Sequence, residues 1–264
     1  YQVLEDIQQG QVPSVYKALS TLLRPLIVAP AGHKLVRCDF SAIEGRVVAW
    51  LANDRPALKE YAGAGKMYER AAAGIYNVPM QAVTKPQRQI GKVAELALGF
   101  QGGYKAFESM AKNYGVKVPA SEAKLIVKKW RESRPAVVKL WADVEKAAIA
   151  AYRTKQPSTC CGGKVTFIYD KNAKNLWIQL PSSRFICLPG FRASTYDGPY
   201  GTSWRLTYKR GNWTPKQGES EWPRADTYGG SLVESLAQGI ARDLLAWAMM
   251  ELEDWGIVMH VHDE

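Results

Sequence analysis

The order of helix and strand patterns along the chain is the feature that most constrains its fold. Apolar residues recur at helical spacing through most of residues 67–152, and short runs of β-branched and aromatic residues follow between residues 164 and 208. Another helical pattern, over residues 231–254, begins with a capping box, Ser231-Leu232-Val233-Glu234, and leads into an apolar strand pattern at residues 257–261. With 264 residues, of which 47% are hydrophobic and 23% charged, the chain can form one large domain or two closely joined subdomains.

The individual elements follow from these patterns. We predict helices over residues 12–23, 67–76, 85–100, 121–133 and 135–152, and strands over residues 164–169, 176–180, 184–188 and 204–208. Residues 209–223, rich in Gly, Pro, Lys and Trp, are expected to form an exposed loop. The final strand pattern has no return strand after it, so we expect the chain to be a fragment of a longer polypeptide.

Composition narrows the classes of function. The net charge of +10 points to a polyanionic partner, nucleic acid first and an acidic membrane surface second; a merely soluble basic surface is the less frequent alternative. No apolar run is long enough to span a membrane and the N-terminus lacks a signal-peptide pattern, so we expect a cytoplasmic protein without a membrane partner. The four cysteines have no CxxC spacing, which disfavours zinc and leaves oxygen ligands for any metal.

Asp39 is the first candidate site residue. It ends an apolar strand pattern, residues 35–40, which passes into a helix whose start, Ser41-Ala42-Ile43-Glu44, fits a capping box. A sheet would hold the backbone of Asp39 while its carboxylate opens to solvent, which suits a hard-cation ligand. A strand-end aspartate is more often a turn or capping residue, and Glu44 has its own structural explanation as a member of the capping box.

The second candidate is the helix that begins after Thr84, where Thr84-Lys85-Pro86-Gln87 fits a capping box. Four residues at every fourth position of this helix share one stripe: Arg88, Lys92, Leu96 and Phe100. The two cations could bind a triphosphate while a base stacks further along the stripe. A surface helix with two cations beside an apolar edge has the same pattern, so the spacing alone does not decide between them.

The third candidate is His262-Asp263-Glu264, which follows the strand pattern at residues 257–261. Two strand-end carboxylates, Asp39 and Asp263, could converge on the pair of metal ions that phosphoryl transfer uses. Carboxylate and water ligands select Mg²⁺ over zinc. Aspartates in hairpin turns are common, so this pairing is an inference from position only.

Together these segments strongly resemble the polymerase domain of DNA polymerase I-type, family A, DNA polymerases of phage or prophage type. Residues 39–46, Asp-Phe-Ser-Ala-Ile-Glu-Gly-Arg, resemble motif A of that family. Residues 88–102 resemble motif B on the fingers O helix, and residues 261–264 resemble motif C. Gln238, which Gly239 follows, resembles the family's glutamine that contacts the minor groove of the primer–template. The motifs stand in the family's order, and the resemblance covers nearly the whole chain.

The resemblance implies roles for the matched residues around the reacting groups. Asp39 and Asp263 would be the catalytic carboxylates that hold two Mg²⁺ ions, with the backbone carbonyl of Phe40 as a further ligand. Arg88 and Lys92 would grip the phosphates of the incoming nucleotide. Lys92 would also protonate the departing pyrophosphate.

Other matched residues would surround the nucleotide and the primer. Phe100 stands where the family keeps an aromatic residue at the template position, and Glu44 stands where it keeps the side chain that excludes a ribose 2′-hydroxyl. Leu96 replaces the bulky aromatic residue that cellular enzymes place against the incoming sugar, a substitution typical of some phage relatives. His262 and Glu264 would lie beside the primer terminus.

The fold that the resemblance implies is α+β, a right-hand polymerase fragment without thumb or C-terminal end. An antiparallel palm sheet would bear the catalytic aspartates, and a mostly helical fingers subdomain would lie between them in sequence. Residues 1–52 and 227–264 would form the palm. Residues 53–226 would form the fingers, with the O-like helix at residues 84–101 and a strand-rich segment at residues 162–208.

The function implied is template-directed DNA synthesis, with primer–template DNA and dNTPs as partners. The primer 3′-hydroxyl would attack the α-phosphorus of a dNTP and pyrophosphate would leave. A single-subunit RNA polymerase is the nearest alternative, but Glu44 argues against it because ribonucleotide substrates need room for the 2′-hydroxyl. The other alternative is a catalytically silent DNA-binding relative, which the retention of Asp39, Asp263, Arg88 and Lys92 disfavours.

Overall fold

A computed structural model of the chain describes residues 2–12, 14–63, 65–198, 201–211, 218 and 220–261, apart from the side chains of residues 24 and 198. The chain divides into two compact units, Tyr1–Phe40 and Ser41–Asp263. Among the described residues, no helix combines the length and the apolar character needed to cross a bilayer.

The first unit contains two short helices and an irregular tail. Helix α1 covers Gln2–Gln8, α2 covers Val15–Leu23 and a 3-10 turn covers Arg24–Leu26. The predicted helix over residues 12–23 is thus confirmed from residue 15 on. The strand predicted over residues 35–40 is wrong: this segment forms no strand, and Val36 is 85% exposed. A strand needs a neighbouring strand to bind its backbone N–H and C=O groups, and no strand of the described residues pairs with this segment.

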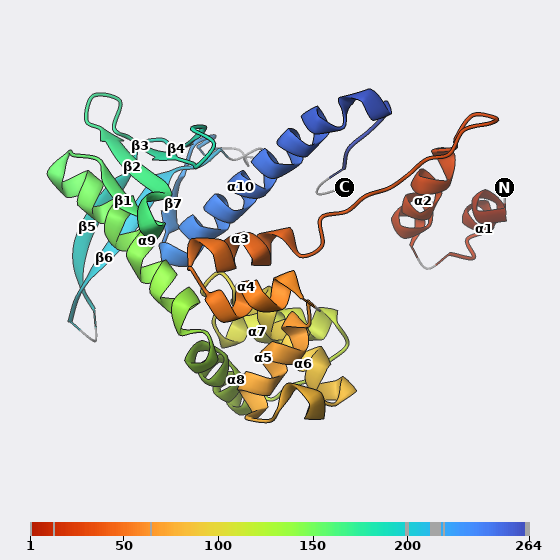
Figure 1. Ribbon diagram of the computed structural model, residues 1–264, viewed down its shortest axis with the longest axis horizontal. Helices are drawn as coiled ribbons and strands as arrows, with labels where there is room; N and C mark the ends of the chain where they lie inside the picture. The colour runs from red at the N-terminus through yellow and green to blue at the C-terminus, as the bar shows by residue number, and fades with distance from the viewer. Residues whose placement is uncertain are drawn as a thin grey trace. The chain divides into compact units, whose positions relative to one another are not determined.

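The first half of the second unit is helical (Figure 1). Its elements are α3 (Ile43–Leu51), α4 (Arg55–Ala62), α5 (Met67–Tyr76), the 3-10 turn Met80–Ala82, α6 (Lys85–Leu98), α7 (Tyr104–Asn113), α8 (Ala120–Ser133) and α9 (Pro135–Thr154). The predicted helices at residues 67–76, 85–100, 121–133 and 135–152 are confirmed, whereas α4 and α7 were not predicted. Helices α5 and α6 pack closely because residue 91 is glycine: a Cβ atom there would lie 2.1 Å from the carbonyl oxygen of Tyr68.

Two antiparallel sheets follow, and α9 packs along the first of them (Figure 1). This sheet has the order β1-β2-β3-β4, with β1 (Ser158–Cys160), β2 (Val165–Asp170), β3 (Asn175–Gln179) and β4 (Phe185–Leu188). The second sheet has the order β5-β6-β7, with β5 (Arg192–Gly198), β6 (Gly201–Lys209) and β7 (Arg224–Thr227). Strands β2, β3, β4 and β6 were predicted; β1, β5 and β7 were not. Residues 212–217 and 219 of the predicted loop lie outside the described residues.

Helix α10 (Gly229–Glu251) packs against α3 and α9 and leads through the 3-10 turn Glu253–Trp255 to an irregular segment. The strand predicted over residues 257–261 is therefore wrong as well, for the reason that holds at residues 35–40: no strand among the described residues pairs with it. The α+β class is confirmed, because helices and antiparallel sheets share the chain. The palm sheet predicted to bear Asp39 is not formed by the described residues, and the division into palm and fingers stays a prediction.

The three predicted helix caps had different outcomes. The capping box at Thr84 is confirmed, with Thr84 and Gln87 bonded reciprocally. The box at Ser41 is wrong, because Ala42 caps α3 in a left-handed conformation with φ 52° and no side-chain bond. The box at Ser231 is wrong too, because α10 begins two residues earlier. Its first amides find acceptors elsewhere in the fold: Gly229 N–H donates to Glu145 at 2.7 Å and Gly230 N–H donates to Gln101 at 2.8 Å.

Candidate active site

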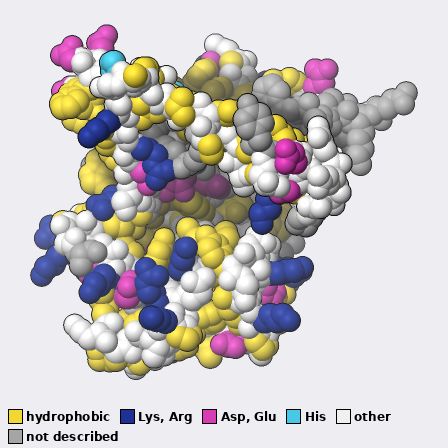
Figure 2. Space-filling view, turned by 90° about the vertical axis from the view of Figure 1, so that its right-hand side faces the viewer, with side chains coloured by type: hydrophobic (Ala, Val, Ile, Leu, Met, Phe, Trp, Pro, Cys, Tyr) yellow, Lys and Arg dark blue, Asp and Glu magenta, His cyan; other side chains and the backbone are white. Residues whose placement is uncertain are grey.

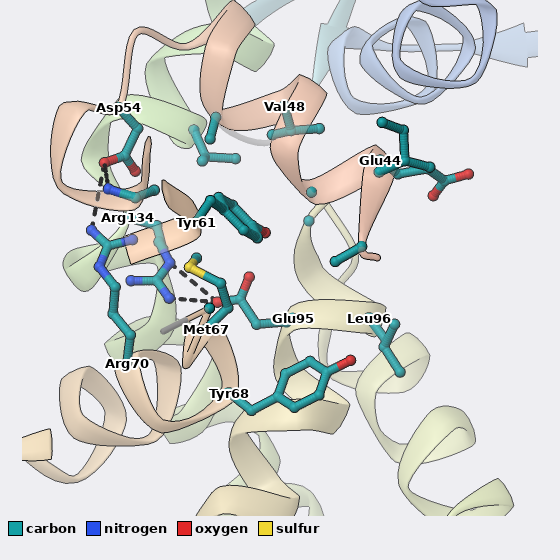
Figure 3. Close-up of a pocket in the computed structure, with 18 of the residues that line it drawn as sticks. Glu44, Val48, Asp54, Tyr61, Met67, Tyr68, Arg70, Glu95, Leu96 and Arg134 are labelled. Carbon is teal, nitrogen blue, oxygen red and sulfur yellow. Dashed lines mark hydrogen bonds and ion pairs between the residues drawn. The ribbon is translucent and has the colours of Figure 1, made fainter. Parts of the chain in front are cut away.

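A cavity of about 440 Å³ opens between α3, α4, α5, α6 and the α8–α9 junction of the second unit (Figure 3). Apolar side chains, among them Val48, Met67 and Trp130, form most of its wall. A few charged and hydroxyl groups converge between them, which is the usual composition of a small-molecule site. Lys and Arg side chains are numerous on the surface of the α5–α8 helices below it (Figure 2).

An ion pair between α6 and the start of α9 holds one wall of this cavity. Arg134, which is 3% exposed, binds Glu95 through Nε at 3.1 Å and through Nη2 at 2.6 Å. The indole N–H of Trp130 donates to the same oxygen, Oε1 of Glu95, at 3.1 Å. Three donors on one carboxylate oxygen compensate for the desolvation of these charges and link α6 to the α8–α9 junction.

A second ion pair lies next to it. Asp54 caps α4 by accepting from the amide of Ala57 at 3.0 Å, and its Oδ1 lies 3.5 Å from Nη2 of Arg70. Burial, and then the nearby positive charge of Arg134, lower the pKa of Arg70 below its ordinary value. Nη1 of Arg70 is buried and, in the described part of the chain, has no hydrogen-bond partner, so it can still donate to a bound molecule.

Tyr61 stands in the middle of the cavity (Figure 3). Burial, with a smaller effect of the negative charge of Glu95, raises the pKa of Tyr61 well above its ordinary value, so the phenol stays protonated at neutral pH. A glycine at residue 45 makes room for it, because a Cβ atom there would lie 2.3 Å from Oη of Tyr61. Arg46 also holds Tyr61 in place. Its guanidinium lies 5.0 Å from the centroid of the Tyr61 ring, and its Nη1 donates to the backbone carbonyl of Tyr61 at 2.9 Å.

Three of the predicted nucleotide-binding residues line this one cavity: Glu44, Leu96 and Phe100. Glu44 comes from the first turn of α3, and the other two come from the end of α6 and the residues just after it. Figure 3 shows Glu44 and Leu96 at one end of the cavity, and Asp54, Arg70 and Arg134 at the other. Leu96 is 43% exposed, so it stands at the mouth.

The two predicted phosphate-binding cations, Arg88 and Lys92, do not line the cavity itself. They stand over Tyr68, which does: the Arg88 guanidinium lies 5.3 Å and the Lys92 ammonium 5.9 Å from its ring centroid. Lys92 also lies 4.7 Å from the ring centroid of Tyr114. Arg88 binds Glu69 at 2.8 Å. Burial alone would raise the pKa of Glu69, but the hydrogen bond and charge of Arg88 outweigh it, so this pKa is lowered.

None of the other predicted site residues that the structure describes is in the wall of this cavity. Asp39 and Phe40 belong to the first unit, and the carboxylate of Asp39 is exposed. Gln238 is exposed on α10 and is not part of the cavity wall. His262, Asp263 and Glu264 lie outside the described residues, so the pairing of Asp39 with Asp263 stays a prediction. The described residues contain no cluster of three or more His, Cys, Asp or Glu side chains that could hold a metal ion.

The sequence did not identify five polar residues of this cavity: Asp54, Tyr61, Arg70, Glu95 and Arg134. One signal was available, because Asp54-Arg55-Pro56 is an N-cap residue followed by a first-turn proline and would have predicted α4. Nothing in the sequence marks Glu95 and Arg134 as partners, because they are 39 residues apart and meet only when α6 packs against α8, whose end leads to Arg134.

Comparison with known proteins agrees with these motifs. A family model described as DNA polymerase family A matches residues 6–179. The chain belongs to DNA polymerase family A. The family predicted from the motifs is thus confirmed.

Relatives of this family A chain include viral and bacterial proteins. The DNA polymerase of Bacillus phage SP02 is 42% identical over 269 aligned residues, which cover 100% of this chain and 39% of that protein. DNA polymerase I of Pseudomonas aeruginosa is 34% identical over 101 residues, 38% of this chain and 11% of that protein. The chain therefore spans well under half the length of these relatives. One solved structure is similar in part; its title is "POL domain of Pol1 from M. smegmatis complex with DNA primer-template and dNTP". Its sequence is 18% identical and the TM-score is 0.48, and the match covers 85% of this chain and 31% of that one.

Proposed function

We propose that this family A chain is the palm and fingers portion of a template-directed DNA polymerase. One observation carries the proposal. Glu44 from the motif A segment and Leu96 and Phe100 from the motif B segment line a single cavity, although residues 47–87 separate the two segments. A cavity with this lining can hold a nucleotide whose sugar contacts Glu44 and Leu96 and whose base lies toward Phe100.

In the proposed reaction the primer 3′-hydroxyl attacks the α-phosphorus of a dNTP in line, and pyrophosphate leaves. Arg88 and Lys92 bind the phosphates, and Lys92 donates a proton to the leaving pyrophosphate. Glu69 binds Nε of Arg88 at 2.8 Å and would compete with a triphosphate for this guanidinium. Closure of α6 around a correctly paired nucleotide then assembles the site, which supports fidelity.

Asp39, Asp263 and the carbonyl of Phe40 would hold two Mg²⁺ ions in this proposal. Two carboxylates and a carbonyl are hard oxygen donors, and this donor chemistry fits Mg²⁺. When bound, the ions would stabilise the charge that develops on the transferring phosphoryl group and its leaving oxygens. Gln238, His262 and Glu264 would contact the primer–template near its 3′ end. The reaction would take place in the cytoplasm, that of the host cell if the protein is phage-encoded.

Primer extension by the full-length parent protein tests this function. Asp39→Asn and Asp263→Asn should each lower the extension rate ~10³-fold or more, because each removes a charge that holds a metal ion. Asp170→Asn, at the end of β2 and outside the three motifs, is the matched control and should extend at the wild-type rate. Survival of extension in either motif variant would place the reaction elsewhere, and no extension by the wild type would favour a silent DNA-binding relative.

A ribonucleotide polymerase is the second candidate, and the place of Glu44 in the cavity wall disfavours it. Competition between dNTPs and NTPs separates the two. We expect strong preference for dNTPs in the wild type and a weaker preference in Glu44→Ala, since the smaller side chain leaves room for a 2′-hydroxyl. An equal preference in both proteins would remove Glu44 from sugar selection.

A further inference from the structure

Two neighbouring thiols, Cys160 and Cys161, are in contact where β1 ends. Their Sγ atoms lie 3.5 Å apart, and both residues are partly exposed. This contact is unusual for adjacent residues, because successive side chains of a strand point to opposite faces. All four cysteines are free thiols in the structure.

The backbone turns the two thiols toward each other. Cys160 is the last residue of β1, with extended φ of −143° and Val165 as its partner on β2. Cys161 then adopts φ 55°, in the left-handed region that L side chains rarely occupy. Gly162 and Gly163 continue with positive φ. A cysteine thus holds the first of three left-handed positions, where glycine would be the least strained residue.

The surroundings favour the thiolate on Cys161. The hydrogen bond from the Cys160 thiol is the main cause that lowers the pKa of Cys161, and the positive charge of Lys164 adds to it, against the effects of burial and Asp143. Nζ of Lys164 donates to the carbonyl of Cys161 at 3.1 Å, which holds the ammonium beside this turn. Cys160 shows the opposite direction: its bond with Cys161 and its burial raise its pKa.

We propose that Cys160 and Cys161 form a reversible two-electron redox site that takes a small-molecule disulfide, such as oxidised glutathione, as its oxidant. The thiolate of Cys161 attacks one sulfur of the disulfide, a mixed disulfide forms on Cys161, and one small thiolate leaves. Sγ of Cys160, on losing its proton, attacks Sγ of Cys161, and the second small thiolate leaves. The two cysteine protons end on the two released thiols, so one disulfide is reduced as the cysteine pair is oxidised.

The product is a disulfide between adjacent residues, and its geometry makes it easy to reduce. Adjacent Cα atoms are about 3.8 Å apart across a trans peptide, which is shorter than the ~4.4 to 6.8 Å that disulfides usually span. The strained bond should reopen readily with a dithiol reductant. Lys164, whose ammonium lies 5.0 Å from the ring centroid of Trp50, connects this turn to α3.

Peptide mass spectrometry of the full-length protein tests the proposal. Trypsin cleavage after Lys155 and Lys164 places both cysteines, and no other, in the peptide of residues 156–164. After treatment with oxidised glutathione and alkylation of the remaining free thiols, this peptide should be unalkylated and lighter by two hydrogen atoms. A dithiol reductant should restore the form that takes two alkyl groups. The variant Cys38→Ser/Cys187→Ser should behave identically.

Two single variants assign the order of attack. Cys160→Ser should stop at a stable mixed disulfide on Cys161, because no second thiol resolves it. Cys161→Ser should react about tenfold more slowly with oxidised glutathione, because it loses the thiolate that attacks first. Serine is close to cysteine in size, and circular dichroism checks that both variants keep the fold.

Three results would overturn the proposal. The peptide could keep two alkylatable thiols under conditions that modify Cys38, which is exposed. It could carry two glutathione groups without an internal bond. It could also be found cross-linked to Cys187. Because the readout is a peptide mass, it does not depend on polymerase activity.

Discussion

Two arginine–carboxylate pairs of nearly equal length stand in opposite environments. Arg134 and Glu95, 2.6 Å apart in the cavity wall, are 3% and 18% exposed, whereas Arg205 and Asp226, 2.7 Å apart on the β5–β7 sheet, are 61% and 62% exposed. The distances do not distinguish the pairs. Burial does, because an unpaired charge is costly only where water cannot solvate it.

The sheet explains why the second pair is exposed. Residues alternate between its two faces: Ala193, Leu206 and Thr227 are buried on one face, and Arg205 and Asp226 are exposed on the other. The exposed face therefore tolerates substitution, whereas the cavity wall depends on both partners of its ion pair.

Arg134→Met should be the most damaging of these substitutions. Among the described residues it leaves the Glu95 carboxylate with only the indole of Trp130 as a donor, which should lower the free energy of unfolding by about 3–5 kcal/mol. Urea denaturation measures this loss. Lys139→Met, on the exposed side of α9, is the matched control and should change little. A loss below about 1 kcal/mol would mean that the buried pair contributes no more than a surface pair.

Replacing both partners should be milder than replacing one. The double variant Arg134→Met/Glu95→Leu removes the unpaired charge as well as the pair, so it should regain about 1–3 kcal/mol relative to Arg134→Met. A double-mutant cycle in urea, completed with Glu95→Leu, gives the coupling energy. Purely additive losses would show that the two side chains act independently.

Glu69 and Arg88 are intermediate in exposure, and their pair should contribute a pH-dependent stability. The folded pKa of Glu69 lies below its ordinary value of 4.5, so the stabilisation is fully present above about pH 4.5 and is lost as the pH falls through the folded pKa. Glu69→Gln should therefore differ from the wild type by about 1 kcal/mol or less at pH 6, and the difference should shrink toward pH 3. Arg88→Gln should remove the same pH dependence. Parallel pH profiles for wild type and Glu69→Gln would contradict the assignment.

Asp226→Asn and Arg205→Gln should leave the melting temperature unchanged within error. The pair should still be visible in the titration of Asp226, because the hydrogen bond from Arg205 lowers the pKa of that carboxyl. In the Arg205→Gln variant the pKa of Asp226 should rise toward its ordinary value of 3.8. NMR can follow this titration. A clear fall in melting temperature with either variant would remove the contrast between the two regions.

Local patterns in the sequence determined much of this protein. The helices at residues 67–76, 85–98, 120–133 and 135–154, the Thr84 capping box and the α+β class could be predicted because their bonds join residues only a few positions apart. The family could be predicted from three short motifs. That Glu44, Leu96 and Phe100 face one cavity agrees with those motifs, while the roles of Asp39 and Asp263 stay predictions.

The tertiary structure decided what long-range contacts control. Ser231 has the right local sequence to cap α10, yet distant side chains cap this helix instead. The amide of Gly229 donates to Glu145, 84 residues away, and the amide of Gly230 donates to Gln101, 129 residues away. Glu95 meets Arg134 only because α6 packs against α8, whose end leads to Arg134. The segments at residues 35–40 and 257–261 have strand-like sequences but no partner strand among the described residues. Each outcome has one physical reason: a polar group binds the nearest acceptor or donor in space, and the sequence lists only its neighbours along the chain.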